Sequence, residues 1–340
     1  MKISNTEDFL ISKNNSLILK GGAILLMLFH HLFYSPSSTH LFWDYHLQLG
    51  SHDIGIVNQL GVYGKLCVAI FVFASGYGLE VTYLNKDLDV LTFYKRRFKK
   101  LFLNYWFIWL LFVPISIFVF GRTMTDAYGN HAVVKMVLDF LGVLNLTGKL
   151  GYNPTWWFYS CIIVLYLLYP LLHKKLSYKW LLFLTISVFV SVCGGIPLIS
   201  PISNYLLPFI VGMLVARTSP SIFDKLKVSD TVIAFILLSL VRNFSGIVAV
   251  IDTLLCLTLA VFLYQVKLAG WLKRIFIQLG KHSQNIFLFH TFIFLYWFRE
   301  ETYITRDPII IFIQLTAVCY LISVAIEFIK QKIGFYKICK

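Results

Sequence analysis

Charged residues are scarce in this sequence, and acidic residues are the scarcest. Only 14% of the 340 residues are charged, with 16 Asp and Glu against 30 Lys and Arg, whereas soluble domains average about 25% charged residues. In addition, 58% of the residues are hydrophobic and the mean hydropathy is +0.75. This composition excludes an ordinary soluble domain and predicts an all-α, polytopic protein embedded in the lipid bilayer.

Clustered charge and clustered cysteine are also absent. The net charge of +14 is spread over short segments between apolar runs, which argues against nucleic acid as a partner. The six cysteines form no C-x-x-C pair and no Cys/His ligand spacing; they are Cys67, Cys161, Cys193, Cys256, Cys319 and Cys339. A disulfide framework is therefore not supported, and no metal site is expected.

Several catalytic signatures are missing. The chain has no G-x-S-x-G, G-x-x-x-x-G-K-[ST], H-E-x-x-H or G-x-G-x-x-G, which leaves no basis for a serine hydrolase, a P-loop NTPase, a zinc protease or a dinucleotide-binding enzyme. No tightly bound cofactor is expected.

The sequence has instead a series of apolar runs of membrane-spanning length or close to it. We expect a single integral-membrane domain over 1–340. Its ten transmembrane helices are predicted at about 16–35, 63–84, 101–121, 155–172, 179–194, 202–216, 229–243, 246–266, 284–299 and 308–329. The first run lacks a convincing small-residue cleavage site after it, so we expect it to stay in the mature protein.

Basic residues alternate from loop to loop in this topology. With the N-terminus inside, most of the 30 Lys and Arg fall in segments that would face the cytoplasm, as the positive-inside rule requires. Both termini are therefore predicted to be cytoplasmic. The two long outer loops, about 36–62 and 122–154, are expected to form either a lid over a polar acceptor or interfacial loops.

Lys20 and His31 are predicted to share one face of the first helix. They are eleven residues apart, so at about 100° per residue they return to within roughly 20° of each other, about 16 Å apart along the axis. Polar groups in hydrocarbon usually face a protein interior or a water-filled cavity. Both side chains are thus expected to point into the space that the other helices enclose.

His31 is the candidate general base, because the unperturbed pKa of an imidazole lies near neutrality. A hydrogen-bonded packing role is the alternative. His30 points about 100° away; a structural or supporting role is expected for it, although it is the main rival for the catalytic role. For His290, in the ninth run, a structural role is favoured over catalysis.

Three further segments admit both a functional and a structural interpretation. Arg96, Arg97 and Lys100 could grip the phosphates of a nucleotide-bearing acyl donor or simply anchor the helix at the inner surface. Ser75 and Gly76 allow close approach either of a ligand or of another helix. The segment that enters the fourth helix could stack on a sugar face or belong to an aromatic belt; its candidates are Asn153, Trp156 and Trp157.

Taken together, these segments resemble the integral-membrane acyltransferase type 3 family, which includes surface-polysaccharide O-acetyltransferases. The resemblance spans about residues 15–300 in shared order and spacing. It is carried by Lys20-Gly…His31, Phe71–Gly76, Arg96–Lys100 with Tyr105-Trp106, Asn153–Phe158, Pro208–Gly212 and Leu279–His290. The family usually has arginine where this chain has Lys20, which keeps a cation but loses the guanidinium fork.

The resemblance implies transfer of an acyl group, most often acetyl, from acetyl-CoA to a hydroxyl of an exported polysaccharide or its lipid-linked precursor. By the same resemblance His31 is the base or a transient acyl carrier. Lys20 and the basic cluster would bind the donor phosphates, while Ser75 and Gly76 would shape the thioester channel. A multi-pass position in a bacterial plasma membrane is expected.

Two alternatives come from other classes of protein. In a transporter or carrier of lipid-linked sugar, His31 and Lys20 would line a pathway, and substrate would move without an acyl donor. In a non-catalytic subunit of a cell-surface synthesis complex, removal of the imidazole would leave glycan acylation intact.

Overall fold

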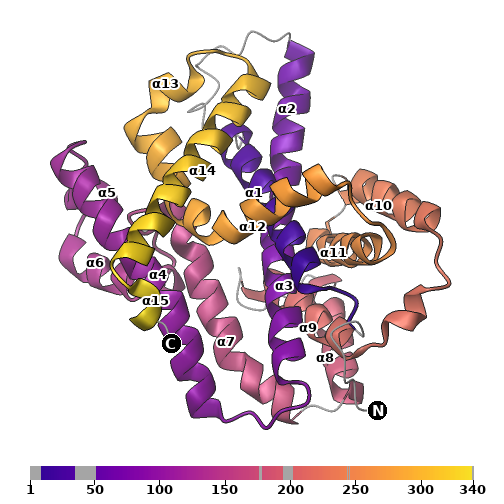
Figure 1. Ribbon diagram of the computed structural model, residues 1–340. Coiled ribbons are helices and arrows are strands. Elements are labelled where there is room, and N and C mark those ends of the chain that lie inside the picture. Colours follow the sequence, from indigo (N-terminus) through magenta and orange to yellow (C-terminus); the bar gives the residue numbers. More distant parts are fainter. Residues whose placement is uncertain are drawn as a thin grey trace. The chain divides into compact units, whose positions relative to one another are not determined.

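The structure, a computed structural model, describes residues 9–34, 51–175, 178–193, 202–242, 244 and 246–338. Over these residues every regular element is helical and no strand occurs (Figure 1), so the all-α fold class is confirmed. The chain forms two compact units. The first unit comprises residues 1–23, 66–93 and 164–281, and the second comprises 24–65, 94–163 and 282–340.

The described residues form the following helices in chain order. They are α1 (Lys13–Phe33), α2 (Ser51–Gly64), α3 (Leu66–Tyr83), α4 (Val90–Phe118), α5 (Met124–Tyr128), α6 (Ala132–Phe140), α7 (Trp157–Lys175), α8 (Tyr178–Cys193), α9 (Ile202–Arg217), α10 (Val228–Arg242), α11 (Val248–Gln265), α12 (Gly270–Thr291), α13 (Arg299–Tyr303), α14 (Pro308–Lys332) and α15 (Phe335–Ile338). Three 3₁₀ turns, η2 (Leu144–Thr147), η3 (Pro154–Trp156) and η4 (Pro220–Phe223), and the π-helical turn η5 (Phe292–Trp297) complete the described part.

Six helices in the described part of the chain are long and apolar enough to cross a membrane. They are Lys13–Phe33, Gly55–Tyr83, Val90–Phe118, Pro154–His173, Val248–Gln265 and Pro308–Lys332. These correspond to the first four, the eighth and the tenth predicted spans. The fifth to seventh predicted spans, the short ones, correspond to α8, α9 and α10, which have 16, 16 and 15 residues. The structure therefore supports six of the ten predicted spans by length and composition.

The helix that corresponds to the ninth predicted span begins well before the apolar run. Helix α12 starts at Gly270 and is continuous through Ser283 to Thr291, whereas the predicted span started at about 284. The polar residues between Lys273 and His282 lie on an amphipathic helix and do not interrupt it, because polar side chains on one face are compatible with the helical period. The loop predicted at 36–62 also contains a helix, since residues 51–62 belong to α2; residues 35–50 lie outside the described part.

Glycines let helices α3 and α9 of the first unit approach until backbone touches backbone. A Cβ atom placed on Gly76 would lie 2.2 Å from the carbonyl oxygen of Phe209, and one placed on Gly212 would lie 2.3 Å from the carbonyl oxygen of Phe73. Each helix thus presents a glycine to a carbonyl of the other. Small residues at such crossings are typical of helix pairs in membranes, where close packing replaces the hydrophobic driving force.

Helices α1 and α12 cross in the same reciprocal way in the first unit. A Cβ atom on Gly21 would lie 2.1 Å from the carbonyl oxygen of Phe276, and one on Gly280 would lie 2.0 Å from that of Leu17. The glycines of the Lys20-Gly and Leu279-Gly segments therefore serve helix packing. Any side chain at these positions would push the two backbones apart.

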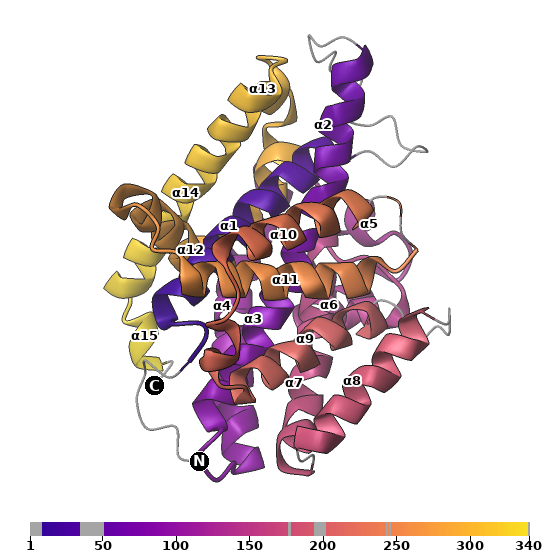
Figure 2. The same ribbon diagram turned by 90° about the vertical axis from the view of Figure 1, so that its right-hand side faces the viewer.

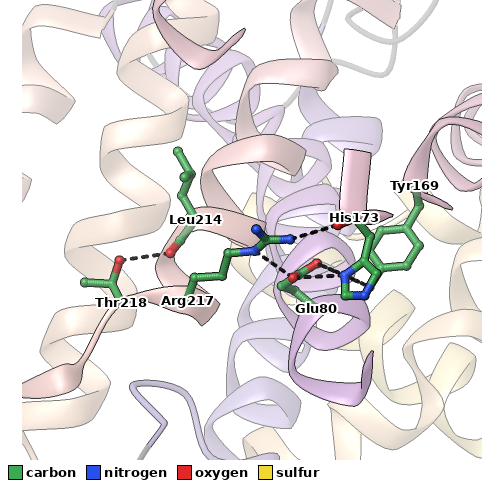
Figure 3. A network of polar contacts seen from close by, with 6 residues as sticks. All are labelled: Glu80, Tyr169, His173, Leu214, Arg217 and Thr218. Carbon is green, nitrogen blue, oxygen red and sulfur yellow. Dashed lines mark hydrogen bonds and ion pairs between the residues drawn. The ribbon is translucent and has the colours of Figure 1, made fainter. Parts of the chain in front are cut away.

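A buried carboxylate ties α3 to α7 and α9 within the first unit (Figure 3). The Glu80 side chain is fully buried and accepts a hydrogen bond from Arg217 Nε at 2.7 Å. The ring of His173 lies 3.1 Å from the same carboxylate, and the hydroxyl of Tyr169 donates to it at 3.2 Å. Because a buried charge is tolerated only when it is paired and hydrogen-bonded, these partners account for a carboxylate inside an apolar helix.

A second ion pair joins α10 to α11, which run side by side in Figure 2. The guanidinium of Arg242 contacts both carboxylate oxygens of Asp252, and both side chains are buried. The bidentate geometry is the strongest arrangement available to such a pair. Arg242 is thus used to hold two helices together.

Candidate active site

His31 lies beside a second histidine in the second unit. Its Nδ1 is 2.7 Å from Nε2 of His290 on α12, and the two rings stack with centroids 4.8 Å apart and planes inclined by 15°. His31 is half-buried, whereas the side chain of His290 is 0% exposed. His31 lies near the C-terminal end of a helix that is long and apolar enough to cross a membrane, so the pair presents one partly accessible and one enclosed imidazole at the end of this helix.

His30 makes a different contact. Its Nδ1 lies 2.7 Å from the carbonyl oxygen of Gly61 on α2, and its ring stacks on Tyr34 with centroids 4.9 Å apart. A Cβ atom on Gly64 would lie 2.5 Å from the carbonyl oxygen of Leu26, so α2 approaches α1 very closely at this level. His30 therefore joins two helices, which is the structural role expected for it.

Asn153 and Trp156 both hold the backbone of α12 just before His290. The side-chain amide of Asn153 and the indole N–H of Trp156 donate to the carbonyl oxygen of Leu288 at 3.2 and 2.9 Å. The π-helical turn η5 follows α12 directly and begins at Phe292. π-helical turns occur often at functional sites, and here one begins two residues after His290.

The predicted acceptor-binding residues thus prove to be mainly internal. Asn153 is fully buried and caps η3 through Thr155, and Trp156 is 1% exposed. Trp157 is half-buried, and its ring meets that of Phe158 edge to face. The wall predicted to stack on a sugar therefore remains a prediction for Trp157, while the structure gives Asn153 and Trp156 a supporting role at α12.

The basic cluster of α4 keeps its charged groups at the helix surface. Arg96 and Lys100 are exposed and Arg97 is half-buried. Arg96 and Lys100 are four residues apart, so they lie about 40° apart around the helix and point the same way. Two cations on one exposed face are an arrangement that suits an anionic ligand.

The other predicted donor-binding residues, Lys20, Ser75 and Gly76, belong to the first unit. Lys20 and Ser75 are half-buried, and α1 is continuous from Lys13 to Phe33, as the shared-face argument requires. Gly76 is buried against the Phe209 carbonyl. The structure therefore explains Gly76 by helix packing, the alternative that the sequence left open.

A polar network that no sequence pattern predicts joins α4, α12 and α14 in the second unit. Lys330 is 1% exposed, and its ammonium donates to Asn104 and, at 2.8 and 3.1 Å, to Asn285 and Glu327. The rings of Phe107 and Phe335 lie within 5.5 Å of the same ammonium. Lys330 is thus a buried cation whose neighbours satisfy it.

The segment predicted as the second outer loop folds around a buried carboxylate. Asp139, at the end of α6, accepts hydrogen bonds from the hydroxyl of Tyr128 at 2.7 Å and from the backbone N–H of Tyr152 at 2.8 Å. Burial raises the pKa of Asp139 from 3.8 to about 6, although these hydrogen bonds oppose the shift. Gly151 must be a glycine here, because a Cβ atom would lie 2.3 Å from the carboxylate.

Arg122, at the start of this segment, contacts two tyrosines. Its guanidinium donates to the carbonyl oxygen of Tyr152 at 2.8 Å and lies 3.5 Å from the ring centre of Tyr296. Helices α5 and α6 pack side by side (Figure 1).

In the described part of the chain no group of three or more His, Cys, Asp or Glu side chains could hold a metal ion.

Comparison with known proteins identifies the family of the chain. Curated proteins and solved structures gave no match to the chain. A protein-family model described as an acyltransferase domain, acyltransferase type 3, matches residues 16–328. Because the match covers nearly the whole chain and several apolar helices of spanning length, this multi-pass membrane protein belongs to the acyltransferase type 3 family.

Proposed function

We propose that the protein is a membrane O-acyltransferase that moves an acetyl group from acetyl-CoA to a hydroxyl of a cell-surface or exported polysaccharide, or of its lipid-linked precursor. Its place would be the plasma membrane of a bacterial cell. The observation that carries the proposal is the His31–His290 pair, with ring nitrogens 2.7 Å apart on a membrane-spanning helix and its neighbour, in a chain of an acyltransferase family.

His31 would act as the general base. In the proposed step its free ring nitrogen takes the proton of the acceptor hydroxyl, and the hydroxyl oxygen attacks the thioester carbonyl carbon. The C–O bond of the new ester forms as the C–S bond breaks. The proton then passes from the imidazolium to the departing sulfur, so the products are the O-acetylated glycan and CoA, and the enzyme is unchanged.

The donor would be held by its phosphates. Arg96 and Lys100 are exposed on one face of α4, and charge-assisted contacts of guanidinium and ammonium groups to phosphate are strong and directional. Lys20 and Arg97 are the other candidates for the same phosphates. We assign no thioester contact to Gly76, since its packing against Phe209 already requires a glycine.

The experiment uses membranes that contain the full-length protein and acetyl-CoA labelled in the acetyl group. Wild-type membranes should label an endogenous glycan in a donor-dependent manner, and His31→Gln should reduce the rate by about 10²–10⁴-fold, the usual contribution of a general base. His30→Gln is the matched control on the adjacent position, and it should retain most of the activity because the His30 contact is to the Gly61 carbonyl.

Three results would overturn the proposal. Movement of a lipid-linked sugar across the membrane without any acyl donor would indicate a carrier. Unchanged glycan acylation in His31→Gln, at normal expression, would exclude this imidazole as the base. Loss of activity in His30→Gln with retention in His31→Gln would transfer the catalytic role to His30.

A further inference from the structure

We propose that His290 is a positioning residue that fixes the tautomer of His31, so that Nδ1 of His31 carries the proton and Nε2 carries the lone pair. The consequence for catalysis rests on the proposed function, whereas the tautomer itself is a property of the structure. The inference follows from the hydrogen-bond partners of the two rings.

The first step concerns Nδ1 of His290. This nitrogen lies 3.0 Å from the carbonyl oxygens of Ile286 and Phe287, one turn earlier in α12. A carbonyl oxygen can only accept a hydrogen bond, so Nδ1 must be an N–H donor. The backbone of the helix thereby determines which nitrogen of His290 bears the proton.

The second step concerns Nε2 of the same ring. His290 is 0% exposed, and the groups in contact with its nitrogens are two carbonyls, the imidazole of His31 and the hydroxyl of Thr291. All of these can be neutral, and an unpaired buried charge is costly. A neutral ring with a proton on Nδ1 has a lone pair on Nε2, so Nε2 of His290 is an acceptor.

The third step transfers this constraint to His31. Its Nδ1 lies 2.7 Å from that acceptor, a shorter contact than the 3.4 Å between Nε2 of His290 and the Thr291 hydroxyl. Two lone pairs cannot share a hydrogen bond, so Nδ1 of His31 must donate. The remaining nitrogen of His31, Nε2, is then unprotonated and able to accept a proton or attack a carbonyl.

In the proposed arrangement His290 orients His31 in the way that a hydrogen-bonded partner orients a catalytic histidine. When Nε2 of His31 takes a proton, the positive charge of the ring is stabilised by the hydrogen bond from Nδ1–H to His290. In serine proteases, a buried partner of the catalytic histidine selects the tautomer, and the loss of that partner's charge lowers kcat by about 10⁴-fold. Here the partner is a neutral ring, and its own orientation is set by the backbone of α12.

The test measures the tautomer directly. Full-length protein with ¹⁵N- and ¹³C-labelled histidine is reconstituted in lipid, and the ring resonances of His31 are assigned by their loss in His31→Gln. In the wild type we expect Nδ1 protonated and Nε2 unprotonated. His290→Phe removes the acceptor but keeps an aromatic ring, and it should move the proton of His31 at least partly to Nε2; His290→Gln offers an amide oxygen and should restore the wild-type pattern.

Activity provides the second readout. We expect His290→Phe to lower the rate of acyl transfer by about 10²–10³-fold and His290→Gln to recover at least tenfold of that loss. The matched control is His282→Phe, on the same helix, because His282 contacts the Ser323 hydroxyl at 2.9 Å; this variant should leave the His31 tautomer unchanged.

The two proposals fail separately. A wild-type His31 with its proton on Nε2, or the same tautomer in wild type and a folded His290→Phe, would overturn the positioning role. If His290→Phe does not fold, the wild-type tautomer and the rescue by Gln decide. A wild-type protein with the expected tautomer but no acyl transfer to any glycan would overturn the proposed function and leave the positioning role standing.

Discussion

The indole of Trp156 donates to the carbonyl oxygen of Leu288 at 2.9 Å, two residues before His290. Asn153 donates to the same oxygen, so the turn η3, just before α7, and the end of α12 are joined by two hydrogen bonds at one atom. A residue predicted to contact substrate from the outside is in fact part of the support of the histidine pair. This relationship leads to the first prediction.

Trp156→Phe should lower kcat with little change in the KM for the glycan acceptor. The substitution removes a hydrogen bond worth about 1 kcal/mol, which corresponds to a loss of about fivefold if α12 loosens at His290. Steady-state transfer rates over a range of acceptor concentrations give both constants. Trp157→Phe is the comparison variant, because the predicted sugar wall remains a prediction for Trp157: a rise in acceptor KM in Trp157→Phe would support that wall. A rise in acceptor KM in Trp156→Phe with an unchanged kcat would contradict the supporting role of Trp156.

Removal of the exposed basic pair of α4 should weaken donor binding. We expect Arg96→Ala combined with Lys100→Ala to raise the KM for acetyl-CoA about 10-fold or more, because hydrogen bonds to charged groups contribute about 1.5–3 kcal/mol each. The matched control combines Lys95→Ala with Lys99→Ala, which removes the same charge at the same spacing from exposed positions about 100° away. Equal effects in both variants would indicate a general surface potential and no specific phosphate site.

Gly76→Ala should destabilise the protein, whereas Gly78→Ala should not. The new methyl group at Gly76 would lie 2.2 Å from the Phe209 carbonyl oxygen, while nothing lies within 4 Å of a Cβ atom at Gly78. Overpacking costs about 1–3 kcal/mol, and alanine in an open helical position gains up to about 1 kcal/mol over glycine. The apparent unfolding temperatures of both variants in detergent measure the difference; similar values would contradict the close crossing of α3 and α9.

Asp139→Asn should change how stability depends on pH. Burial raises the pKa of Asp139 from 3.8 to about 6, so the folded protein favours the protonated carboxyl, and this contribution to stability is present below about pH 4 and lost as the pH rises to about 6. The asparagine variant lacks this term. Its apparent unfolding temperature relative to the wild type should therefore increase between pH 4 and 6 and stay constant above; a decrease over that interval would show that ionised Asp139 is the favoured form.

Much of the helical frame could be predicted because long apolar runs leave few alternatives in a membrane. His31 could be found from its position alone, since a titratable ring in an apolar helix is costly and therefore informative. Gly76 is a prominent small residue in the sequence as well, but a sequence does not distinguish close approach of a ligand from close approach of a helix. The contact with the Phe209 carbonyl resolves that choice in favour of helix packing.

The partners of buried polar groups could not be predicted. The burial of Lys330 does not follow from its position, because a lysine near a helix end usually extends to the interface. Its burial depends on the side-chain amide oxygens of Asn104 and Asn285, which lie on other helices. No local sequence pattern predicts that pairing. Asp139 was missed for a similar reason, since its partners Tyr128 and Tyr152 lie in a segment that was predicted as a loop.

The paired imidazoles are 259 positions apart along the chain. During synthesis α1 is made early. The contact between His31 and His290 can form only after α12 has been synthesised. A chain truncated ahead of α12 consequently lacks the pair, however well its earlier helices insert. The His31–His290 contact is thus among the last contacts that the growing polypeptide can form.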